Sequence, residues 1–149
     1  MTKQKEARED VSCIGRKKIL VLDDEEVVRT CITKLLGHFG FEVVAVKDGA
    51  EAVRSYKVAK ALGQPYQAVI LDLNIPKGMG GNWTNQKLKQ IDPKVVTIVS
   101  SANYEHPAMA CFRQYGFDGI LPKPYGLEEL SRLLNEVIAT SNGNQAERV

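Results

Sequence analysis

Five short apolar runs alternate with five amphipathic stretches along the chain. The runs are rich in Val, Ile and Leu without in/out alternation, which is typical of strands that are buried on both faces of a parallel sheet. The amphipathic stretches favour helices. The predicted strands are 18–22, 42–46, 68–72, 95–100 and 117–121, and the predicted helices are 25–38, 49–62, 82–91, 105–115 and 127–140. Five β–α units in succession predict an α/β fold, in which helices cover both faces of a parallel sheet.

Three residues mark expected helix ends. Gly40 and Gly63 follow the first two predicted helices, where a glycine commonly ends a helix. Asn82 could cap the third helix through its side chain.

Length and composition indicate one domain. The chain has 149 residues, of which 44% are hydrophobic and 26% are charged, as in an ordinary globular protein. No apolar run approaches the roughly 20 residues that cross a bilayer, and the start of the chain has no apolar signal core. We therefore expect a cytoplasmic protein without membrane contact. The predicted organisation is a polar leader at 1–16, one domain at 17–140 and a polar tail at 141–149.

The net charge of +2 is unevenly distributed. Residues 1–18 hold six of the 20 basic and three of the 18 acidic groups, which leaves fourteen basic and fifteen acidic groups for the rest. The domain itself is almost neutral and shows no concentrated basic face, so nucleic-acid binding by this chain is not expected. Three scattered cysteines, without CxxC spacing, indicate reduced thiols rather than a disulfide framework or zinc site, and Cys31 is expected to pack as a small hydrophobe.

Polar residues gather at the predicted carboxyl ends of the strands. In an open parallel sheet the ligand site lies at this edge, beside the point where the strand order reverses. Side chains alternate along a strand, so only one of the two serines that end the fourth run should point toward the site. The residues concerned are Asp23 and Asp24 after the first strand, Asp72 at the end of the third, Ser100 and Ser101 at the end of the fourth, and Lys123 after the fifth.

Crowded carboxylates at one edge favour a cation. Like charges raise one another's pKa unless a positive group neutralises them. Mg²⁺, or Mn²⁺ in its place, suits a site of a few carboxylates that leaves room for water and phosphate. Asp72 could then be a nucleophile that forms an aspartyl phosphate, with Lys123 holding a phosphoryl oxygen. Glycines of the loop 78–81 could let the backbone approach the phosphate closely.

Four motifs carry a resemblance to a known family. They are 20-LVLDDEE-26, 70-ILDLNIPKGMGG-81, 99-VSSAN-103 and 121-LPKPYG-126. The region from about 17 to 139 resembles the receiver domains of two-component response regulators. The resemblance implies a flavodoxin-like (βα)5 fold, a doubly wound five-stranded parallel sheet with strand order 2-1-3-4-5.

The resemblance also implies roles for six residues. Ile120 departs from the family pattern, because many receivers carry Tyr or Phe three residues before the lysine. Tyr104 or Tyr125 could take the place of that aromatic residue. The implied roles are Asp72 as phosphoacceptor, Asp24 as a direct Mg²⁺ ligand, Asp23 as a ligand largely through water, Asn74 as a main-chain carbonyl ligand, Ser101 as the switch hydroxyl and Lys123 as the active-site lysine.

The implied function is a phosphoryl-accepting signalling switch. A phosphohistidine on a sensor histidine kinase or a histidine phosphotransfer domain would donate the group, and the chain would catalyse its own phosphorylation and dephosphorylation. The response would change the face formed by the fourth helix, fifth strand and fifth helix, with an unknown protein as downstream partner. The stretch 54–81 also resembles receivers fused to hybrid histidine kinases, so histidine kinase activity would require a fused kinase outside this chain.

Two alternatives from other classes stay open. An Mg²⁺-dependent phosphatase with an aspartate nucleophile would need a second acid two residues after the nucleophile, where this chain has Asn74. A non-phosphorylated interaction module of the same fold would be expected to lack Asp72, Asp24 or Lys123, and all three are present.

Overall fold

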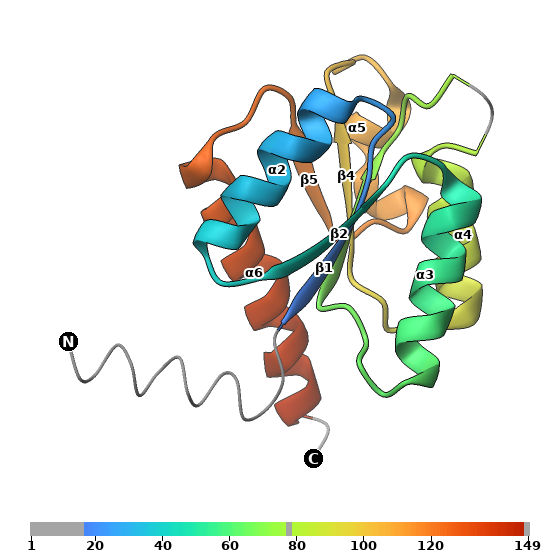
Figure 1. Cartoon of the computed structure of the whole chain (residues 1–149), viewed down its shortest axis with the longest axis vertical. Helices are drawn as coiled ribbons and strands as arrows, with labels where there is room; N and C mark the ends of the chain where they lie inside the picture. The colour runs from blue at the N-terminus through green and yellow to red at the C-terminus, as the bar shows by residue number, and fades with distance from the viewer. Residues whose placement is uncertain (1–16, 77–78, 148–149) are drawn as a thin grey trace.

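A five-stranded parallel sheet forms the centre of the protein. The structure is a computed structural model, and it describes residues 17–76 and 79–147. Its strand order is β2-β1-β3-β4-β5, which confirms the predicted flavodoxin-like topology (Figure 1). All neighbouring strands run parallel. The strands are β1 (Lys18–Leu22), β2 (Glu42–Val46), β3 (Ala68–Asp72), β4 (Thr97–Ser101) and β5 (Gly119–Pro122).

Helices cover both faces of this sheet. Figure 1 shows α2 and α6 on one side and α3 and α4 on the other. The bounds are α2 (Glu26–His38), α3 (Gly49–Ala61), α4 (Gly81–Ile91), α5 (Pro107–Ala110), the 3-10 helix η1 (Phe112–Tyr115) and α6 (Leu127–Glu147). None of the helices in the described part of the chain has the length and apolar content that a membrane crossing needs.

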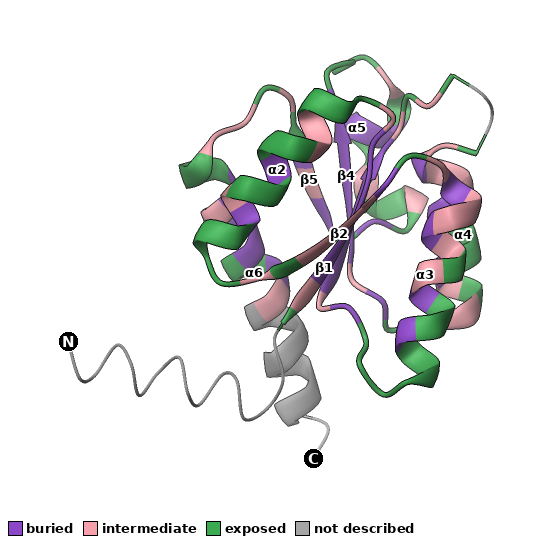
Figure 2. Ribbon diagram, viewed as in Figure 1, coloured by how far each residue is buried: buried purple, intermediate pink, exposed green. Residues whose placement is uncertain are grey.

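Alternate residues of each strand supply two separate hydrophobic cores. In β1, Ile19 and Val21 pack toward α2 and α6, whereas Leu20 and Leu22 pack toward α3, α4 and α5. Every residue of β3 is buried. The central strands are therefore buried along their length in Figure 2, which explains their unbroken apolar runs.

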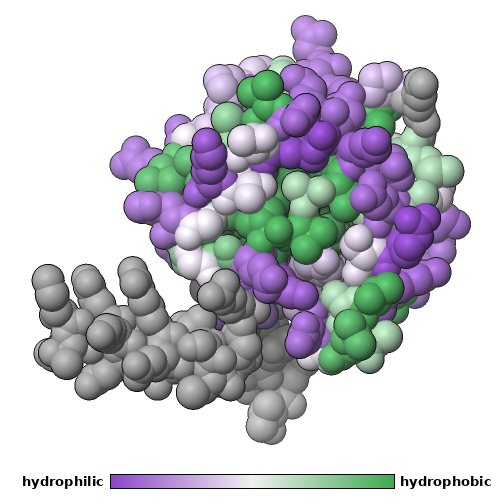
Figure 3. All heavy atoms as spheres, viewed as in Figure 1, coloured by the Kyte–Doolittle hydropathy of each residue, from purple (hydrophilic) through white to green (hydrophobic). Residues whose placement is uncertain are grey.

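The edge strand β2 is less completely covered. Its residues Val43, Val44 and Ala45 are half-buried. Figure 3 shows the molecule from the side on which β2 lies, and there hydrophobic residues near the middle are surrounded by polar ones. Edge position thus accounts for the contrast with fully buried β3.

Two strands begin later than the sequence pattern predicts. The N–H of Val95 donates to the carbonyl of Asp92 at 3.0 Å, so the chain is still in a turn there and β4 begins at Thr97. In the same way, the N–H of Phe117 donates to the carbonyl of Phe112 at 3.0 Å, and β5 begins at Gly119. These apolar residues belong to the core without belonging to the sheet.

The predicted helix 105–115 is broken into two short helices. Pro107 occupies the first turn of α5, where its fixed φ and missing N–H are tolerated, and His106 caps that helix by accepting the N–H of Ala108 at Nδ1. Cys111 leaves the helical conformation, with φ −129° and ψ 53°, and separates α5 from η1. At the other end of the domain, α6 continues to Glu147, past the predicted end at 140.

Two of the three expected helix ends are confirmed and one is wrong. Gly40 and Gly63 have positive φ values of 88° and 72°, and each follows the residue that caps the end of α2 or α3. Asn82 does not cap α4, because it already lies inside the helix and Gly80 occupies the cap position.

Two cysteines lie on opposite faces of the sheet. Cys31 on α2 is exposed, so its expected role as a small packed hydrophobe is wrong. Cys111, between α5 and η1, is also exposed. Cys13 and the rest of the predicted leader 1–16 lie outside the described residues.

Candidate functional site

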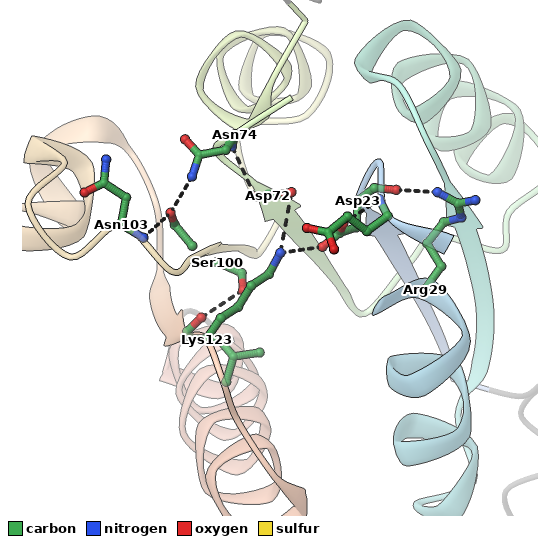
Figure 4. Close-up of polar contacts among 10 residues, drawn as sticks. Asp23, Arg29, Asp72, Asn74, Ser100, Asn103 and Lys123 are labelled. Carbon is green, nitrogen blue, oxygen red and sulfur yellow. Dashed lines mark hydrogen bonds and ion pairs between the residues drawn. The ribbon is translucent and has the colours of Figure 1, made fainter. Parts of the chain in front are cut away.

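Asp72 is the last residue of β3 and lies at the centre of a group of polar side chains (Figure 4). Its side chain is almost fully buried, because only 3% of the residue is exposed. One carboxylate oxygen, Oδ1, accepts the N–H of Asn74 at 3.1 Å. The other, Oδ2, lies 3.5 Å from Nζ of Lys123. The carboxylate is therefore held from two directions, by the loop after β3 and by the loop after β5.

Lys123 links the acid of β3 to the acid after β1. Its Nζ donates to Oδ2 of Asp23 at 2.7 Å and is much closer to that oxygen than to Asp72. Burial alone would lower the pKa of Lys123, but the bond to Asp23 and the charges of Asp72 and Asp23 outweigh burial, so the pKa is raised. The side chain is consequently a cation at neutral pH.

The loop between β1 and α2 gathers three acids. Carboxylate oxygens of Asp23, Asp24 and Glu25 all lie within 4.8 Å of one another. Oδ1 of Asp23 accepts the N–H of Glu25 at 3.0 Å, which turns the chain toward α2. Arg29 of α2 donates from Nη1 to the carbonyl of Asp23 at 2.8 Å and holds the loop from the helix side, as Figure 4 shows.

The charge of Asp72 is incompletely compensated by the protein. Burial, and to a smaller extent the charges of Asp23 and Asp24, raise the pKa of Asp72 to about 6 against the lowering effects of the Asn74 N–H and of Lys123. A buried carboxylate with a raised pKa favours a cation from solution. Carboxylate and carbonyl oxygens are the ligands that Mg²⁺ prefers, so the residues present fit a magnesium ion.

The two serines of β4 have different partners. Ser100 is buried and donates its hydroxyl to the carbonyl of Leu121 at 2.8 Å, which ties β4 to β5. Oγ of Ser101 accepts from Nδ2 of Asn74 at 2.9 Å and from the N–H of Asn103 at 3.0 Å. Of the two hydroxyls, that of Ser101 therefore bonds to the loop that follows Asp72, whereas that of Ser100 bonds to β5.

Glycines after Asp72 allow a close helix approach. A Cβ on Gly81 would lie 2.8 Å from the carbonyl oxygen of Asp72, and one on Gly80 would lie 2.7 Å from that of Leu73. The sequence predicted that glycines here make room for a phosphate. In the structure these two make room for the start of α4 against the backbone of β3.

Sequence reasoning missed three contacts around the site. Arg29 carries no local signal, because an arginine six residues after Asp23 is indistinguishable from an ordinary surface residue of a helix. Glu25 was assigned only to the start of a helix, yet it also joins the acidic group. Tyr104, which is exposed, donates from its hydroxyl to the carbonyl of Lys123, whereas Ile120 packs against the core.

The chain belongs to the response regulator receiver domain family, whose model matches residues 19–135. It is therefore a receiver domain of two-component signalling. Such domains interact with histidine kinases or phosphotransfer proteins and bind Mg²⁺ at their acidic site.

Three similar proteins illustrate the family. The chain is 34% identical to the response regulator GacA of Pseudomonas aeruginosa over 82% of its own length and 55% of that protein. It is 30% identical to the chemotaxis protein CheY of Bacillus subtilis over 81% of its length and 97% of that protein. The crystal structure of the receiver domain of the sensor histidine kinase PA1611 from Pseudomonas aeruginosa has a magnesium ion in its active site cleft; it superimposes with a TM-score of 0.72 at 28% identity, over 84% of this chain and 99% of that one.

These relatives differ in what accompanies the receiver. The chain spans about half the length of the GacA proteins that it matches. It spans nearly all of CheY. The shared region is therefore the receiver domain itself.

Proposed function

We propose that Asp72 accepts a phosphoryl group from a phosphohistidine on a histidine kinase or a histidine phosphotransfer domain. The observation that carries this proposal is the buried carboxylate at the end of β3, whose pKa is raised to about 6 beside a lysine and an acidic loop. Burying the charge of Asp72 at this position destabilises the fold. A role as a nucleophile in contact with a bound cation would explain why the acid is placed there.

The transfer forms one bond and breaks one. A carboxylate oxygen of Asp72 attacks phosphorus, the P–N bond to the donor imidazole breaks, and the imidazole leaves with the electron pair and takes up a proton. Asp23 and Asp24 would hold Mg²⁺ together with Asp72 and the main-chain carbonyl of Asn74. When bound, Mg²⁺ supplies charge neutralisation for the phosphoryl oxygens; Mn²⁺ could replace it.

Lys123 and Ser101 stabilise the transferred group. The ammonium of Lys123 already lies 3.5 Å from Asp72 and can exchange that contact for a phosphoryl oxygen. Ser101 is the last residue of β4 and directly follows Ser100, which pairs with Asp72 in the strand register. Its hydroxyl can donate to a second phosphoryl oxygen.

The response would pass to the face formed by α5, β5 and α6, which are the fourth helix, fifth strand and fifth helix of the prediction. The main chains of Ser101 and Lys123 are already joined, because the N–H of Lys123 donates to the carbonyl of Ser101 at 3.0 Å. Movement of either residue toward a phosphoryl group therefore shifts both loops beneath this face, as a two-state change driven by new contacts.

The wider setting is proposed from the relatives. The receiver domain makes up nearly all of CheY and forms one part of the sensor histidine kinase PA1611, so the domain of this chain could act as a separate regulator or as the receiver portion of a hybrid histidine kinase. A cytoplasmic location stays a prediction that fractionation of the native protein checks.

Intact-protein mass spectrometry tests the proposed function. The protein is incubated with acetyl phosphate and Mg²⁺, and we expect the mass of one phosphoryl group to be added. The Asp72→Asn variant and an EDTA control should show no addition. Absence of phosphorylation and of acetyl phosphate hydrolysis in the wild type would favour the silent interaction module, and turnover of generic phosphate esters would favour the phosphatase.

A further inference from the structure

Asn74 contacts both the proposed phosphoacceptor and the proposed switch hydroxyl. Its main-chain N–H donates to Oδ1 of Asp72 at 3.1 Å (Figure 4). Its side-chain Nδ2 donates to Oγ of Ser101 at 2.9 Å. One residue thus connects the end of β3 to the end of β4. The predicted role of Asn74 used only its main-chain carbonyl, so the side-chain bond is not explained by that role.

The two bonds to Ser101 determine what its hydroxyl can still do. A serine hydroxyl has two acceptor lone pairs and one O–H donor. Nδ2 of Asn74 occupies one lone pair, and the main-chain N–H of Asn103 occupies the other at 3.0 Å. The O–H is left as the remaining hydrogen-bonding group of a fully buried residue. Phosphoryl oxygens only accept hydrogen bonds, so a hydroxyl prepared in this way matches them.

We propose that the Asn74 side chain is a positioning residue for phosphoryl transfer. By donating to Ser101, it orients the hydroxyl as a donor before the phosphoryl group arrives. The inference rests on the proposed function. A donor fixed in advance stabilises developing charge more effectively than one that must reorient during the reaction. Because Asn74 also bonds to Asp72, the phosphoryl-accepting carboxylate and the Ser101 hydroxyl keep fixed positions relative to each other.

A double-mutant cycle between Asn74 and Ser101 tests this role. The four proteins are the wild type, Asn74→Ala, Ser101→Ala and the double variant. Initial phosphorylation rates are measured by intact mass at saturating Mg²⁺ and fixed acetyl phosphate. We expect each single variant to be slower by about 5- to 10-fold, on the scale of one lost hydrogen bond. The double variant should be no slower than Ser101→Ala alone, because Asn74 acts through the hydroxyl.

Magnesium affinity separates this role from a general loss of structure. Asn74→Ala keeps the main-chain carbonyl, so Mg²⁺ binding measured by calorimetry should stay within about 2-fold of the wild type, since the ligand set is intact. Asn74→Gln keeps an amide donor on a longer side chain and should recover part of the rate. Asn135→Ala, at an exposed asparagine of α6, is the matched control for loss of an amide and should leave the rate unchanged.

Three outcomes would overturn the inference. Rate losses that multiply in the double variant would mean that Asn74 acts independently of Ser101. Faster phosphorylation of Asn74→Ala would mean that the amide holds the hydroxyl away from the phosphoryl group. A wild type that accepts no phosphoryl group would remove the proposed function together with the inference, whereas the first two outcomes leave the proposed function intact.

Discussion

Two acids of this domain, Asp72 at the end of β3 and Asp92 after α4, are held in opposite ways. Burial would raise the pKa of Asp92, but a hydrogen bond from the Tyr56 hydroxyl, the N–H of Lys94 and the charges of Lys60 and Lys94 together lower it. The pKa of Asp72 is raised, because burial outweighs its few partners.

The difference separates a structural carboxylate from a reactive one. At Asp92 the protein provides the compensation, with the Tyr56 hydroxyl at 2.7 Å and Lys60 at 3.9 Å. At Asp72 much of the compensation is left to groups that come from solution. A site that is completed by a ligand can respond to that ligand, whereas a site completed by the fold cannot.

The largest expected effect comes from removing the lysine at the reactive acid. Lys123→Met takes away the ammonium that faces Asp72 and Asp23. We expect phosphorylation by acetyl phosphate to slow by about 100-fold, the usual scale for losing one preorganised donor. Intact mass over time measures the rate, and circular dichroism with Mg²⁺ present checks folding. A folded variant with a rate within about 3-fold of the wild type would place the transition-state charge elsewhere.

The second-largest effect is expected on the free energy of unfolding, when the buried charge of Asp72 is removed. At neutral pH without metal, Asp72→Asn should stabilise the protein by about 1–3 kcal/mol, because the substitution removes a buried charge whose pKa the fold raises. Chemical denaturation in EDTA at pH 7.5 measures the change. Mg²⁺ should stabilise the wild type and have little effect on the variant.

The pH dependence of stability provides the check on that prediction. The pKa of Asp72 is about 6 in the folded protein, against an ordinary value of 3.8 that applies to the unfolded chain. Between these two pH values the folded state binds more protons than the unfolded state. Stability of the metal-free wild type should therefore rise as pH falls from 7 toward 5, relative to Asp72→Asn. Parallel curves for the two proteins would mean that the charge at Asp72 is already compensated.

The smallest effect on phosphorylation is expected at the structural acid. Tyr56→Phe removes the hydroxyl bonded to Asp92 and should cost about 1.5–3 kcal/mol of unfolding free energy, the usual worth of a hydrogen bond to a charged group. The lowered pKa of Asp92 gives stability that is present above its unfolded pKa and lost as pH falls through the folded one, so the variant should lose less stability in acid than the wild type. Phosphorylation should be unchanged, and a slower rate would show that the two acids are coupled.

The hydrophobic pattern predicted the strands and most of the helices well because both depend on local periodicity, whereas the strand order followed from the resemblance to receiver domains. Five unbroken apolar runs define strands buried on both faces, and the start of β1 and the end of β3 were placed correctly to the residue. The pattern is less exact at the ends of elements, where a single turn or the backbone conformation of one residue decides. Thr97 begins β4 after a turn closed by Asp92, and Cys111 breaks a helix that its neighbours favour.

For the candidate site, the sequence predicted which residues gather but not which of their atoms bond. The rule that ligands bind at the carboxyl ends of parallel strands brought Asp23, Asp72 and Lys123 together from residues far apart in the sequence. Which atoms bond to one another could not be derived in this way. The amide of Asn74 on Ser101 and the guanidinium of Arg29 on the Asp23 carbonyl depend on side-chain directions that only the folded chain defines.

The two exposed thiols have a practical consequence. Cys31, on α2, and Cys111, between α5 and η1, lie at opposite faces of the sheet. Once Cys13 is replaced by serine, spin labels at these native positions span the domain without further engineering. Cys111 follows α5, which is part of the face proposed to respond, and Cys31 is on α2, which is not, so the distance between the two labels reports on the signalling state.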